Sequence, residues 1–555
     1  MPPSTSTKKL IAPLLWALAL LVALLYLVAG LPLRRARKEW RAGNVEAAII
    51  ALGSWPRLHI RAADYDEMLA VCYLTVGQSD AAREPLGRMA RRDAEWFPIL
   101  RKVEVARELV GRGRYGEFLQ YDTAVHQHRE SGELPLYRAA AQLGTNRLAE
   151  SETTFATVDP GAVDPARYKT LKGAIDQRKQ GSFPLILDRN GQVIAIYQVS
   201  NGDVVATNVD FAPLIDREGG ALTFESNLKK IGTSATIETT LDPFMQRAAL
   251  AALGSYRASM VVIDTRSNEI LAVANSAGTG PHTNLAFDGT YEPGSVIKVL
   301  TGLNAIDSHV DLAKFFPLNC PGFLVLNGRQ FFDWAKHDTV GDLDEAMAVS
   351  CNVSFGMLGI RIGAPKVIEF LHKAGFDDTA DVGFTRVPLG KIVGKLNNAY
   401  EIASAADGLQ HETINALHVA TLSSMVANAG ILQTPRLIRG RRTVLGERFG
   451  DFPVSAGVRI ASPEAVAAMT RAMEAVVTNP RGTGRRVEVA GLPIAVKTGT
   501  AGDASPRYNC LILAFAPSHA PRLAIGLIAE NAGPAEFAGA KIAHDFFERV
   551  KGKIQ

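Results

Sequence analysis

The sequence is poor in cysteine and in net charge. Its 555 residues hold four cysteines, Cys72, Cys320, Cys351 and Cys510, and the formal charge is only +4. Four widely spaced cysteines match neither a disulfide framework nor the paired spacing of a zinc site, so we predict no metal and no cofactor. No basic stripe interleaved with aromatic residues is present, which makes nucleic acid an unexpected partner. We interpret Cys351 as a small buried thiol.

A long apolar run lies near the N-terminus. Residues 10–33 contain no charged side chain and are long enough for a bilayer-spanning helix, with a short cytoplasmic tail at 1–9. The small residues at 28–30 leave a cleaved signal open as an alternative. Positive charges are more frequent after the run than before it, and this count alone would leave the C-terminal side in the cytoplasm. The length implies two or more domains.

Three short motifs follow in a fixed order in the second half of the chain. They are Ser295-Val296-Ile297-Lys298, Ser350-Cys351-Asn352 and Lys497-Thr498-Gly499-Thr500. The Ser-x-x-Lys pattern also occurs at 6–9 and 226–229, so it carries little information alone. Ser-x-Asn and Lys-Thr-Gly each occur once, after Ser295. The ordered combination therefore indicates a site far more strongly than its parts do.

The first motif has the chemistry of an activated serine. Pro293 and Gly294 precede Ser295 and an apolar stretch follows, which predicts Ser295 in the first turn of a buried helix. Residues three apart share a helix face, so we expect the Lys298 amine near the Ser295 hydroxyl. A lysine can accept the serine proton only when neutral, and burial beside a second cation, Lys497, favours the neutral amine. The motifs together predict a serine that can be acylated.

These residues resemble the penicillin-binding transpeptidases, the serine acyltransferases of bacterial cell-wall synthesis. The similarity extends to neighbouring segments and covers the chain from about Thr239 to the C-terminus. The segments that carry it are 291–295, 332–337, 348–353, 426–430 with Pro435, 482–484, 496–501 and 514–517. The resemblance implies an α+β fold, with an antiparallel sheet covered by helices.

The resemblance also implies a catalytic role for five residues. Ser295 would attack the carbonyl of a D-alanyl-D-alanine stem peptide, and Lys298 would accept its proton. Ser350 would relay a proton to the leaving amine, and Asn352 would hold Lys298 and the substrate amide. Lys497 would bind the terminal carboxylate of the substrate.

A substrate-binding set follows from the third motif. Thr498, Gly499 and Thr500 would line the substrate, with both threonines on its carboxylate. The backbone N–H groups of Ser295 and Thr500 would form the oxyanion hole, whose donors typically contribute ~3 to 4 kcal/mol to barrier lowering. Two segments depart from the family pattern. Val496 replaces a frequent glycine, and 407–409 with 415–418 only loosely match the usual sequence.

The rest of the chain is predicted to form three further parts. Residues 34–180 are helical in composition, and Gly43, Gly77, Gly113 and Gly144 recur at intervals typical of tetratricopeptide-like (TPR-like) hairpins. An irregular helical spacer is the alternative. Residues 181–238 predict a small β-rich pedestal with a hairpin around 188–191. The catalytic domain would then occupy 239–555.

Three functions fit this pattern. The leading one is a membrane-anchored D,D-transpeptidase, or a carboxypeptidase with the same acyl-enzyme. A serine β-lactamase would need rapid deacylation, for which the sequence indicates no dedicated base. A non-catalytic β-lactam sensor or scaffold would rely on the helical repeats. Because an exported stem peptide is the expected substrate, we place the catalytic domain outside the bacterial cytoplasmic membrane. No segment resembles a glycosyltransferase, so a separate glycan polymerase is expected to dock on the helical region.

Overall fold

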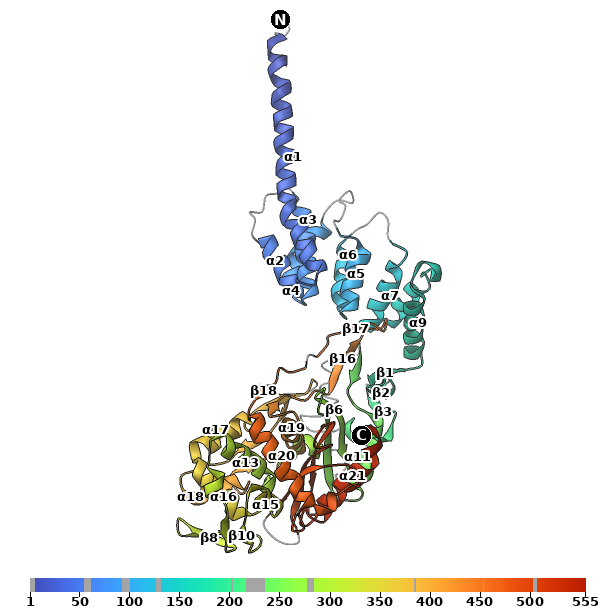
Figure 1. Ribbon diagram of the computed structural model, residues 1–555. Helices are drawn as coiled ribbons and strands as arrows, with labels where there is room; N and C mark the ends of the chain where they lie inside the picture. The colour runs from blue at the N-terminus through green and yellow to red at the C-terminus, as the bar shows by residue number, and fades with distance from the viewer. Residues whose placement is uncertain are drawn as a thin grey trace. The chain divides into compact units, whose positions relative to one another are not determined.

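A computed structural model describes residues 5–53, 61–91, 100–125, 131–200, 203–215, 235–276, 284–383, 386–452, 454–502 and 507–555 (Figure 1). Residues 1–4 of the predicted tail and 216–234 of the predicted pedestal lie outside these ranges. The chain divides into two compact units. Unit 1 comprises Met1–Phe183, Thr233–Thr236 and Arg441–Gly450, and unit 2 comprises Pro184–Gly232, Ile237–Gly440 and Asp451–Gln555.

The predicted membrane segment forms part of a single long helix, α1 (Thr5–Arg41). Within the described residues, Leu15–Arg41 is the one helical stretch long and apolar enough to cross a membrane, with a mean hydropathy of 2.3. Its large apolar side chains from Leu15 to Leu27 are exposed, whereas Leu33, Ala36 and Trp40 are buried in the core of unit 1. The helix thus continues without a break from the apolar run into the helical unit.

Unit 1 is built from consecutive helical pairs (Figure 1). After α1 they are α2 (Val45–Gly53), α3 (Ala62–Thr75), α4 (Ser79–Ala90), α5 (Lys102–Gly111), α6 (Tyr115–Ala124), α7 (Leu134–Gly144), α8 (Leu148–Phe155) and α9 (Pro165–Lys179). Sequence neighbours pack as α1 with α2, α3 with α4, α5 with α6 and α7 with α8; α6 also contacts α7. This pairing agrees with the predicted helical hairpins.

The same turn joins the two helices of all four pairs. At its centre one residue adopts a left-handed backbone: Gly43 (φ 84°), Gly77 (φ 78°), Gly113 (φ 68°) or Asn146 (φ 62°). The next residue donates its N–H to the carbonyl five positions earlier, in Asn44 to Glu39, Gln78 to Tyr73, Arg114 to Leu109 and Arg147 to Gln142. This is the Schellman ending of a helix. The repeat in the sequence therefore marks a repeated turn, and the TPR class itself stays a prediction.

Gly144 has a different role from the three turn glycines. It is the last residue of α7, and a Cβ placed there would lie 2.3 Å from the Tyr115 ring. Tyr115 is buried, and its Oη accepts a 3.0 Å hydrogen bond from the N–H of Val444. Val444 and Leu445 join the same hydrophobic core. The sequence did not predict that a segment from residues 441–450 would belong to the helical unit.

The predicted pedestal contains a mixed sheet in the order β17-β16-β4-β1-β2-β3. Strands β1 (Ser182–Leu187) and β2 (Val193–Gln198) are hydrogen-bonded neighbours, joined by a turn at the predicted position. β3 (Val204–Ala206) pairs antiparallel with β2, and β4 (Thr236–Thr239) pairs parallel with β1. The distant hairpin of β16 (Ile438–Arg442) and β17 (Arg448–Phe449) completes the sheet. Periodicity within 181–238 could not reveal these last two strands.

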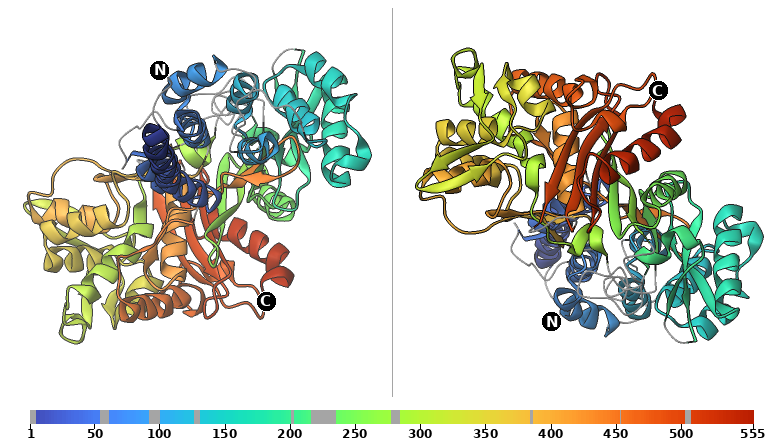
Figure 2. Two further views of the ribbon diagram at one scale, coloured as in Figure 1. Left: turned by 90° about the horizontal axis from the view of Figure 1, so that it is seen from above. Right: turned by 90° about the horizontal axis from the view of Figure 1, so that it is seen from below.

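The core of unit 2 is a five-stranded antiparallel sheet in the order β19-β20-β21-β5-β6. Its strands are β5 (Ala258–Asp264), β6 (Glu269–Asn275), β19 (Ala495–Ala501), β20 (Asn509–Ala516) and β21 (Leu523–Ala529). Almost every residue in it is buried. Helix α19 (Ala416–Ala427) covers one face, and α11 (Pro243–Leu253) with α21 (Ala538–Ile554) covers the other. Figure 2 shows α21 beside these strands. The predicted sheet covered by helices is confirmed.

A group of helices adjoins β19 and carries two of the motifs. It includes α13 (Lys298–Asp307), α15 (Leu343–Ala348), α16 (Asn352–Ile362), α17 (Ala364–Lys373), α18 (Ala399–Ala406) and α20 (Pro463–Thr478). Helix α13 packs against α16, α17 and α20, and α20 packs against β19. The three motifs therefore meet where this helical group joins the edge of the sheet.

Candidate functional site

Ser295 lies in a 3₁₀ turn, η4 (Gly294–Ile297), which leads directly into α13. The turn begins after Pro293, as the sequence predicted, but its tighter winding places the start of the α-helix at Lys298. Gly294 has φ 54°, and its N–H donates a 2.9 Å hydrogen bond to the carbonyl of Gly408. Ser295 is partly exposed, and its hydroxyl makes no hydrogen bond within the described part of the chain.

The nucleophile turn packs closely against β19, and glycine makes this approach possible. A Cβ on Gly499 would lie 2.9 Å from the carbonyl oxygen of Pro293 and 3.0 Å from Cγ1 of Val296. A Cβ on Gly294 would lie 2.7 Å from the carbonyl oxygen of Thr500. Any side chain at either position would separate the turn from the strand. Gly499 therefore helps to position Ser295 by allowing this close packing. It is not among the described residues that line the cavity.

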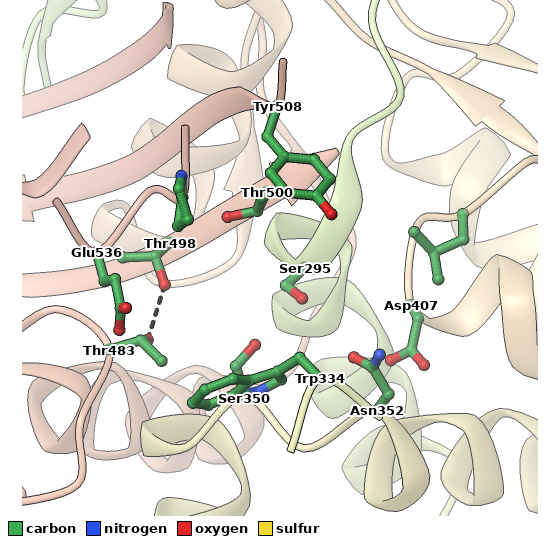
Figure 3. Close-up of a pocket in the computed structure, with 12 residues that line it drawn as sticks. Ser295, Trp334, Ser350, Asn352, Asp407, Thr483, Thr498, Thr500, Tyr508 and Glu536 are labelled. Atoms are coloured by element: carbon green, nitrogen blue, oxygen red, sulfur yellow. Dashed lines mark hydrogen bonds between the residues drawn. The ribbon is translucent and has the colours of Figure 1, made fainter. Parts of the chain in front are cut away.

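A cavity of about 340 Å³ opens over the turn. Its lining includes Ser295, Ser350, Asn352, Thr498 and Thr500, which come from all three motifs (Figure 3). Thr498 and Thr500 lie on β19, and Asn352 begins α16. The structure therefore brings five of the eight predicted site residues to one hollow surface.

The two motif lysines lie beneath this surface and are fully buried. Lys497 Nζ donates to Ser350 Oγ at 2.9 Å and to the carbonyl of Thr498 at 2.8 Å. Lys298 Nζ donates to the carbonyl of Ser350 at 2.7 Å and to Asn352 Oδ1 at 2.5 Å, and its Nζ lies 3.4 Å from Ser350 Oγ. The Ser350 hydroxyl is therefore shared between two amines.

Ser350 adopts a backbone conformation that side-chain-bearing residues seldom use. Its φ is 55°, in the left-handed region, where a non-glycine residue is strained. Backbone hydrogen bonds hold the bend, from Ser350 N to the carbonyl of Met347 (3.2 Å) and from Cys351 N to that of Ala346 (3.0 Å). The conformation directs both the carbonyl and the hydroxyl of Ser350 toward the lysines, as their hydrogen bonds require.

The expected contact between Ser295 and Lys298 is not a hydrogen bond in this structure. Within the described residues, the side-chain hydrogen bonds of Lys298 go to Ser350 and Asn352, and an ion pair joins it to Asp407. Hydrogen bonds of catalytic groups are often long before substrate binds. The geometry thus leaves Lys298 next to the nucleophile turn, held by the second motif.

Asp407 is a member of the site that the sequence analysis did not select. It follows α18, lines the cavity floor and is 1% exposed, with Oδ1 3.4 Å from Lys298 Nζ. Burial raises the pKa of Asp407 to about 8, although the Lys298 charge opposes this shift. The only signal in the sequence was the departure from the family pattern at 407–409.

The loop that carries Asp407 is fixed to the nucleophile turn. A Cβ on Gly408 would lie 2.3 Å from the carbonyl oxygen of Gly294. Asp407 is thus a carboxyl group that interacts with the two buried lysines. The net charge of these three side chains depends on pH. Burial, followed by the nearby charge of Lys298, lowers the pKa of Lys497 well below its ordinary value. This environment favours a neutral amine on Lys497.

The cavity has further polar and aromatic walls. Thr483 and Thr498 share a 2.7 Å hydrogen bond between their Oγ1 atoms (Figure 3). Trp334 donates from Nε1 to the carbonyl of Val349 at 2.9 Å and leaves 57% of its surface exposed. Tyr508 and Glu536 also line the cavity; in Figure 3 Tyr508 lies across from Ser350 and Trp334, and Glu536 lies beside Thr483. Tyr508 and Glu536 belong to no motif, so spacing could not identify them.

Comparison with known proteins matches this part of the chain to one family. Residues 258–551 match the family model described as penicillin binding protein transpeptidase domain. A probable peptidoglycan D,D-transpeptidase, PbpC of Pseudomonas aeruginosa, is 26% identical over 350 residues, covering 58% of this chain and 59% of that protein. The peptidoglycan D,D-transpeptidase PbpA of Mycobacterium tuberculosis is 26% identical over 339 residues, covering 53% of this chain and 67% of that protein. The match with PbpC thus spans less than two thirds of that relative.

Solved structures show the same fold. The crystal structure of PBPA from Mycobacterium tuberculosis aligns with a TM-score of 0.60 at 21% identity, over 67% of this chain and 99% of that one. The sequence-based resemblance is thereby confirmed, and more than half of the chain falls within the matched model. With its three motifs gathered around one cavity in this fold, the chain belongs to the penicillin-binding protein transpeptidase family.

Proposed function

We propose that the protein is a D,D-transpeptidase that cross-links peptidoglycan stem peptides through an acyl-enzyme on Ser295. The observation that carries the proposal is the sharing of the Ser350 hydroxyl by Lys298 and Lys497 beneath the cavity that Ser295 lines. A buried chain of amines and a hydroxyl can move a proton from the nucleophile to a leaving amine. The proposal is also supported by the names of the relatives.

In the proposed acylation, Ser295 Oγ attacks the carbonyl carbon of a D-alanyl-D-alanine peptide. Lys298 accepts the serine proton, and Asn352 Oδ1 keeps its amine in place. The proton then passes through Ser350 to the departing amine as the peptide bond breaks. The backbone N–H groups of Ser295 and Thr500 stabilise the oxyanion. A second amine attacks the acyl-enzyme to form the cross-link, whereas water would give carboxypeptidase activity.

The substrate carboxylate is proposed to bind along β19. The Thr498 and Thr500 side chains line the cavity, and Thr483 adds a third hydroxyl. Lys497 Nζ is buried behind them, so it acts through its hydrogen bond to Ser350. Gly499 serves the site by allowing the close packing of the nucleophile turn.

A labelled penicillin tests the nucleophile directly. The protein is incubated with the label, digested, and the adduct mapped by mass spectrometry. We expect the adduct on Ser295, abolished in Ser295→Ala and strongly reduced in Lys298→Met, with unchanged melting temperature for the serine variant. Label on another serine, or none on folded protein, would overturn the assignment.

Two alternatives predict different results. A β-lactamase would release the label rapidly, so fast antibiotic turnover would favour that function. A sensor or scaffold would not need catalysis, and normal cross-linking in cells by Ser295→Ala would favour it. A stable adduct together with loss of cross-linking in the variant supports the transpeptidase.

We propose that α1 anchors the protein in the bacterial cytoplasmic membrane with the catalytic unit outside. Its apolar part has the length and composition of a membrane span. The positive charges after the span oppose this orientation, but long domains translocate largely regardless of charge. A reporter that is active only outside the cytoplasm, fused after Gln555, should be active. Activity of a cytoplasm-only reporter would contradict the topology.

We further propose that a separate glycan polymerase supplies the acceptor strands and docks on unit 1. Stacked helical hairpins commonly bind partners. The purified protein should not polymerise lipid-linked precursor, and removal of 36–180 should impair function in cells while Ser295 is still labelled. Val444 and Leu445 are buried in the unit 1 core, so the deletion would leave them without their packing partners. The deletion should therefore be combined with Val444→Ser and Leu445→Ser. Full complementation would refute the docking role.

A further inference from the structure

A basic face on α1 follows directly after the apolar run. The side chains of Arg34, Arg35 and Lys38 are exposed, and none of them makes a hydrogen bond or an ion pair within the described part of the chain. The sequence has no acidic residue before Glu39. Three positive charges therefore stand together on this helix without a carboxylate partner among the described residues.

The two other cations of this segment are already paired. Arg37 Nη2 lies 3.7 Å from Glu104 Oε2, and Arg41 Nη2 donates a 3.0 Å hydrogen bond to the same oxygen. Glu104 belongs to α5, so these two cations hold α1 to another helix of unit 1. The structure thus divides the five positive charges that follow the apolar run into two with a partner in the fold and three that face outward.

The three unpaired cations continue the exposed apolar side of the same helix. Leu27 and Leu31 are 57% and 58% exposed, and Arg34, Arg35 and Lys38 come one and two turns later. An α-helix repeats every 3.6 residues, so these five positions share one side. The opposite side of α1 is the one buried in the core of unit 1. The exposed side therefore changes from apolar to basic within one helical turn.

Helix geometry places this change at the surface of a bilayer. A hydrocarbon core about 30 Å thick takes about 20 helical residues at ~1.5 Å each, and counted from residue 10 it ends near Gly30. The headgroup layer adds roughly 5 to 7 Å, which is about four more residues. Side chains on a helix lean toward its N-terminus, so those of Arg34 and Arg35 reach back into this layer.

Contacts at the start of α3 mark the same level. The Arg61 guanidinium lies 4.8 Å from the centre of the Tyr26 ring and pairs with Asp64 at 2.7 Å. Tyr65 Oη donates a 3.2 Å hydrogen bond to the carbonyl of Ala29. A charged pair is costly inside hydrocarbon, and tyrosine is frequent at membrane interfaces. In a membrane-anchored protein the hydrocarbon layer would therefore end near residues 26–30, which agrees with the count along the helix.

We propose that Arg34, Arg35 and Lys38 bind the phosphate groups of anionic phospholipids in the leaflet next to unit 1. Lipid phosphates supply the negative charge that three unpaired cations require, and α1 brings these cations to the depth of the headgroups. Lipid binding at this face depends on the membrane anchoring proposed for α1. It gives a role to the positive charges after the span, because two of them serve unit 1 and three serve the membrane surface.

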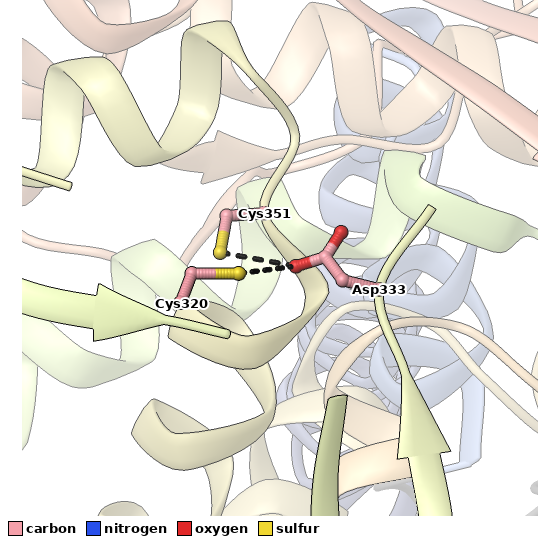
Figure 4. Close-up of side chains that lie close together, drawn as sticks. All are labelled: Cys320, Asp333 and Cys351. Atoms are coloured by element: carbon pink, nitrogen blue, oxygen red, sulfur yellow. Dashed lines mark hydrogen bonds between the residues drawn. The ribbon is translucent and has the colours of Figure 1, made fainter. Parts of the chain in front are cut away.

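Local lipid enrichment beside α1 tests this binding in the full chain. A fluorophore is attached at Leu31→Cys, on the side that carries the cations. The four native cysteines are buried, and in unit 2 the thiols of Cys320 and Cys351 point at Asp333 (Figure 4), so the label is directed to position 31. The labelled protein is reconstituted in phosphatidylcholine vesicles that contain spin-labelled phosphatidylglycerol or spin-labelled phosphatidylcholine as the quencher.

Phosphatidylglycerol should quench the fluorophore at a mole fraction at least about fivefold lower than phosphatidylcholine, because one surface cation typically contributes about that factor. High salt should weaken this preference. It should be lost, with an unchanged melting temperature, in a variant that combines Arg34→Gln, Arg35→Gln and Lys38→Gln, since these side chains have no described partner in the fold. A control that removes three exposed lysines elsewhere should keep the preference; it combines Lys169→Gln, Lys172→Gln and Lys395→Gln.

Equal quenching by the two lipids in the wild type would overturn the proposal, and so would a preference that survives in the triple variant of α1. Both results would leave the anchor intact, because quenching itself shows that position 31 lies in the bilayer. Absence of quenching by either lipid would refute the anchoring of α1 and lipid binding with it. Sodium phosphate and sodium chloride at equal ionic strength should weaken the preference equally. A stronger effect of phosphate would indicate a site for free phosphate and contradict the assignment to lipid.

Discussion

Lys497 Nζ donates a 2.9 Å hydrogen bond to Ser350 Oγ, although 147 positions separate the two residues in sequence. Lys298 Nζ lies 3.4 Å from the same oxygen. A hydroxyl between two buried amines can accept a proton from one side and donate to the other. The relation joins the second and third motifs: one supplies the hydroxyl and the other an amine that holds it.

Ser350→Ala should slow acylation by labelled penicillin about 100-fold or more, because a positioned proton-transfer group typically contributes that much. The rate constant for adduct formation on Ser295 is the measurement. Ser354→Ala is the matched control, since Ser354 is buried in the first turn of α16, four residues after Ser350, and bonds to neither lysine within the described residues. Equal rates for wild type and Ser350→Ala would remove Ser350 from the proton path.

Asp407→Asn should change the pH dependence of acylation. Burial raises the pKa of Asp407 to about 8 from an ordinary value of 3.8, so the carboxyl is neutral at lower pH. Above about pH 8 the Asp407 carboxyl carries a negative charge 3.4 Å from Lys298 Nζ, and this charge should reduce the rate of acylation. The wild-type profile should bend near pH 8, and the asparagine profile should not.

The same ionisation affects stability. Because the pKa is raised in the folded state, the stabilisation from the neutral carboxyl is complete below about pH 4 and is lost as pH rises through about 8. When the pH is raised from 6 to 9, the melting temperature of the wild type should therefore fall further than that of Asp407→Asn. Parallel pH curves for the two proteins would contradict the raised pKa.

Gly499→Ala should impair acylation by displacing the nucleophile turn. The new Cβ would meet the Pro293 carbonyl at 2.9 Å and Val296 at 3.0 Å, and overpacking of this kind typically costs about 1 to 3 kcal/mol. Gly552→Ala in α21 is the control, because no atom lies within 4 Å of its added Cβ. Acylation rate and melting temperature should both fall for position 499 and not for 552.

Gly144→Ala should destabilise the helical unit and spare the acylation site. Its Cβ would lie 2.3 Å from the buried ring of Tyr115, whereas the Cβ of Gly116→Ala in α6 meets nothing within 4 Å. We expect about 1 to 3 kcal/mol lost for Gly144→Ala, and a slight gain for Gly116→Ala. Limited proteolysis within 34–180 would report the first effect. Faster cleavage in Gly116→Ala than in Gly144→Ala would refute the packing role.

Local patterns in the sequence determined much of this architecture. The residues around 188–191 predicted the hairpin of β1 and β2, because the strand pattern and its turn belong to one short chain segment. The apolar run predicted the long first helix, and the recurring glycines marked the inter-helix turns at Gly43, Gly77 and Gly113. The ordered motifs identified five of the residues that line the cavity. Each of these features depends on residues close together in the chain.

Only tertiary structure decided the features that join distant segments. The roles of Gly144 and Gly499 depend on Tyr115 and Pro293, which pack against them from elsewhere in the chain. Asp407 enters the site because folding buries it beside Lys298, and the 441–450 segment joins unit 1 through Val444 and Leu445. The spacing of residues along one sequence does not give the distance in space between such segments. Burial and close packing create these contacts, and they exist only in the folded chain.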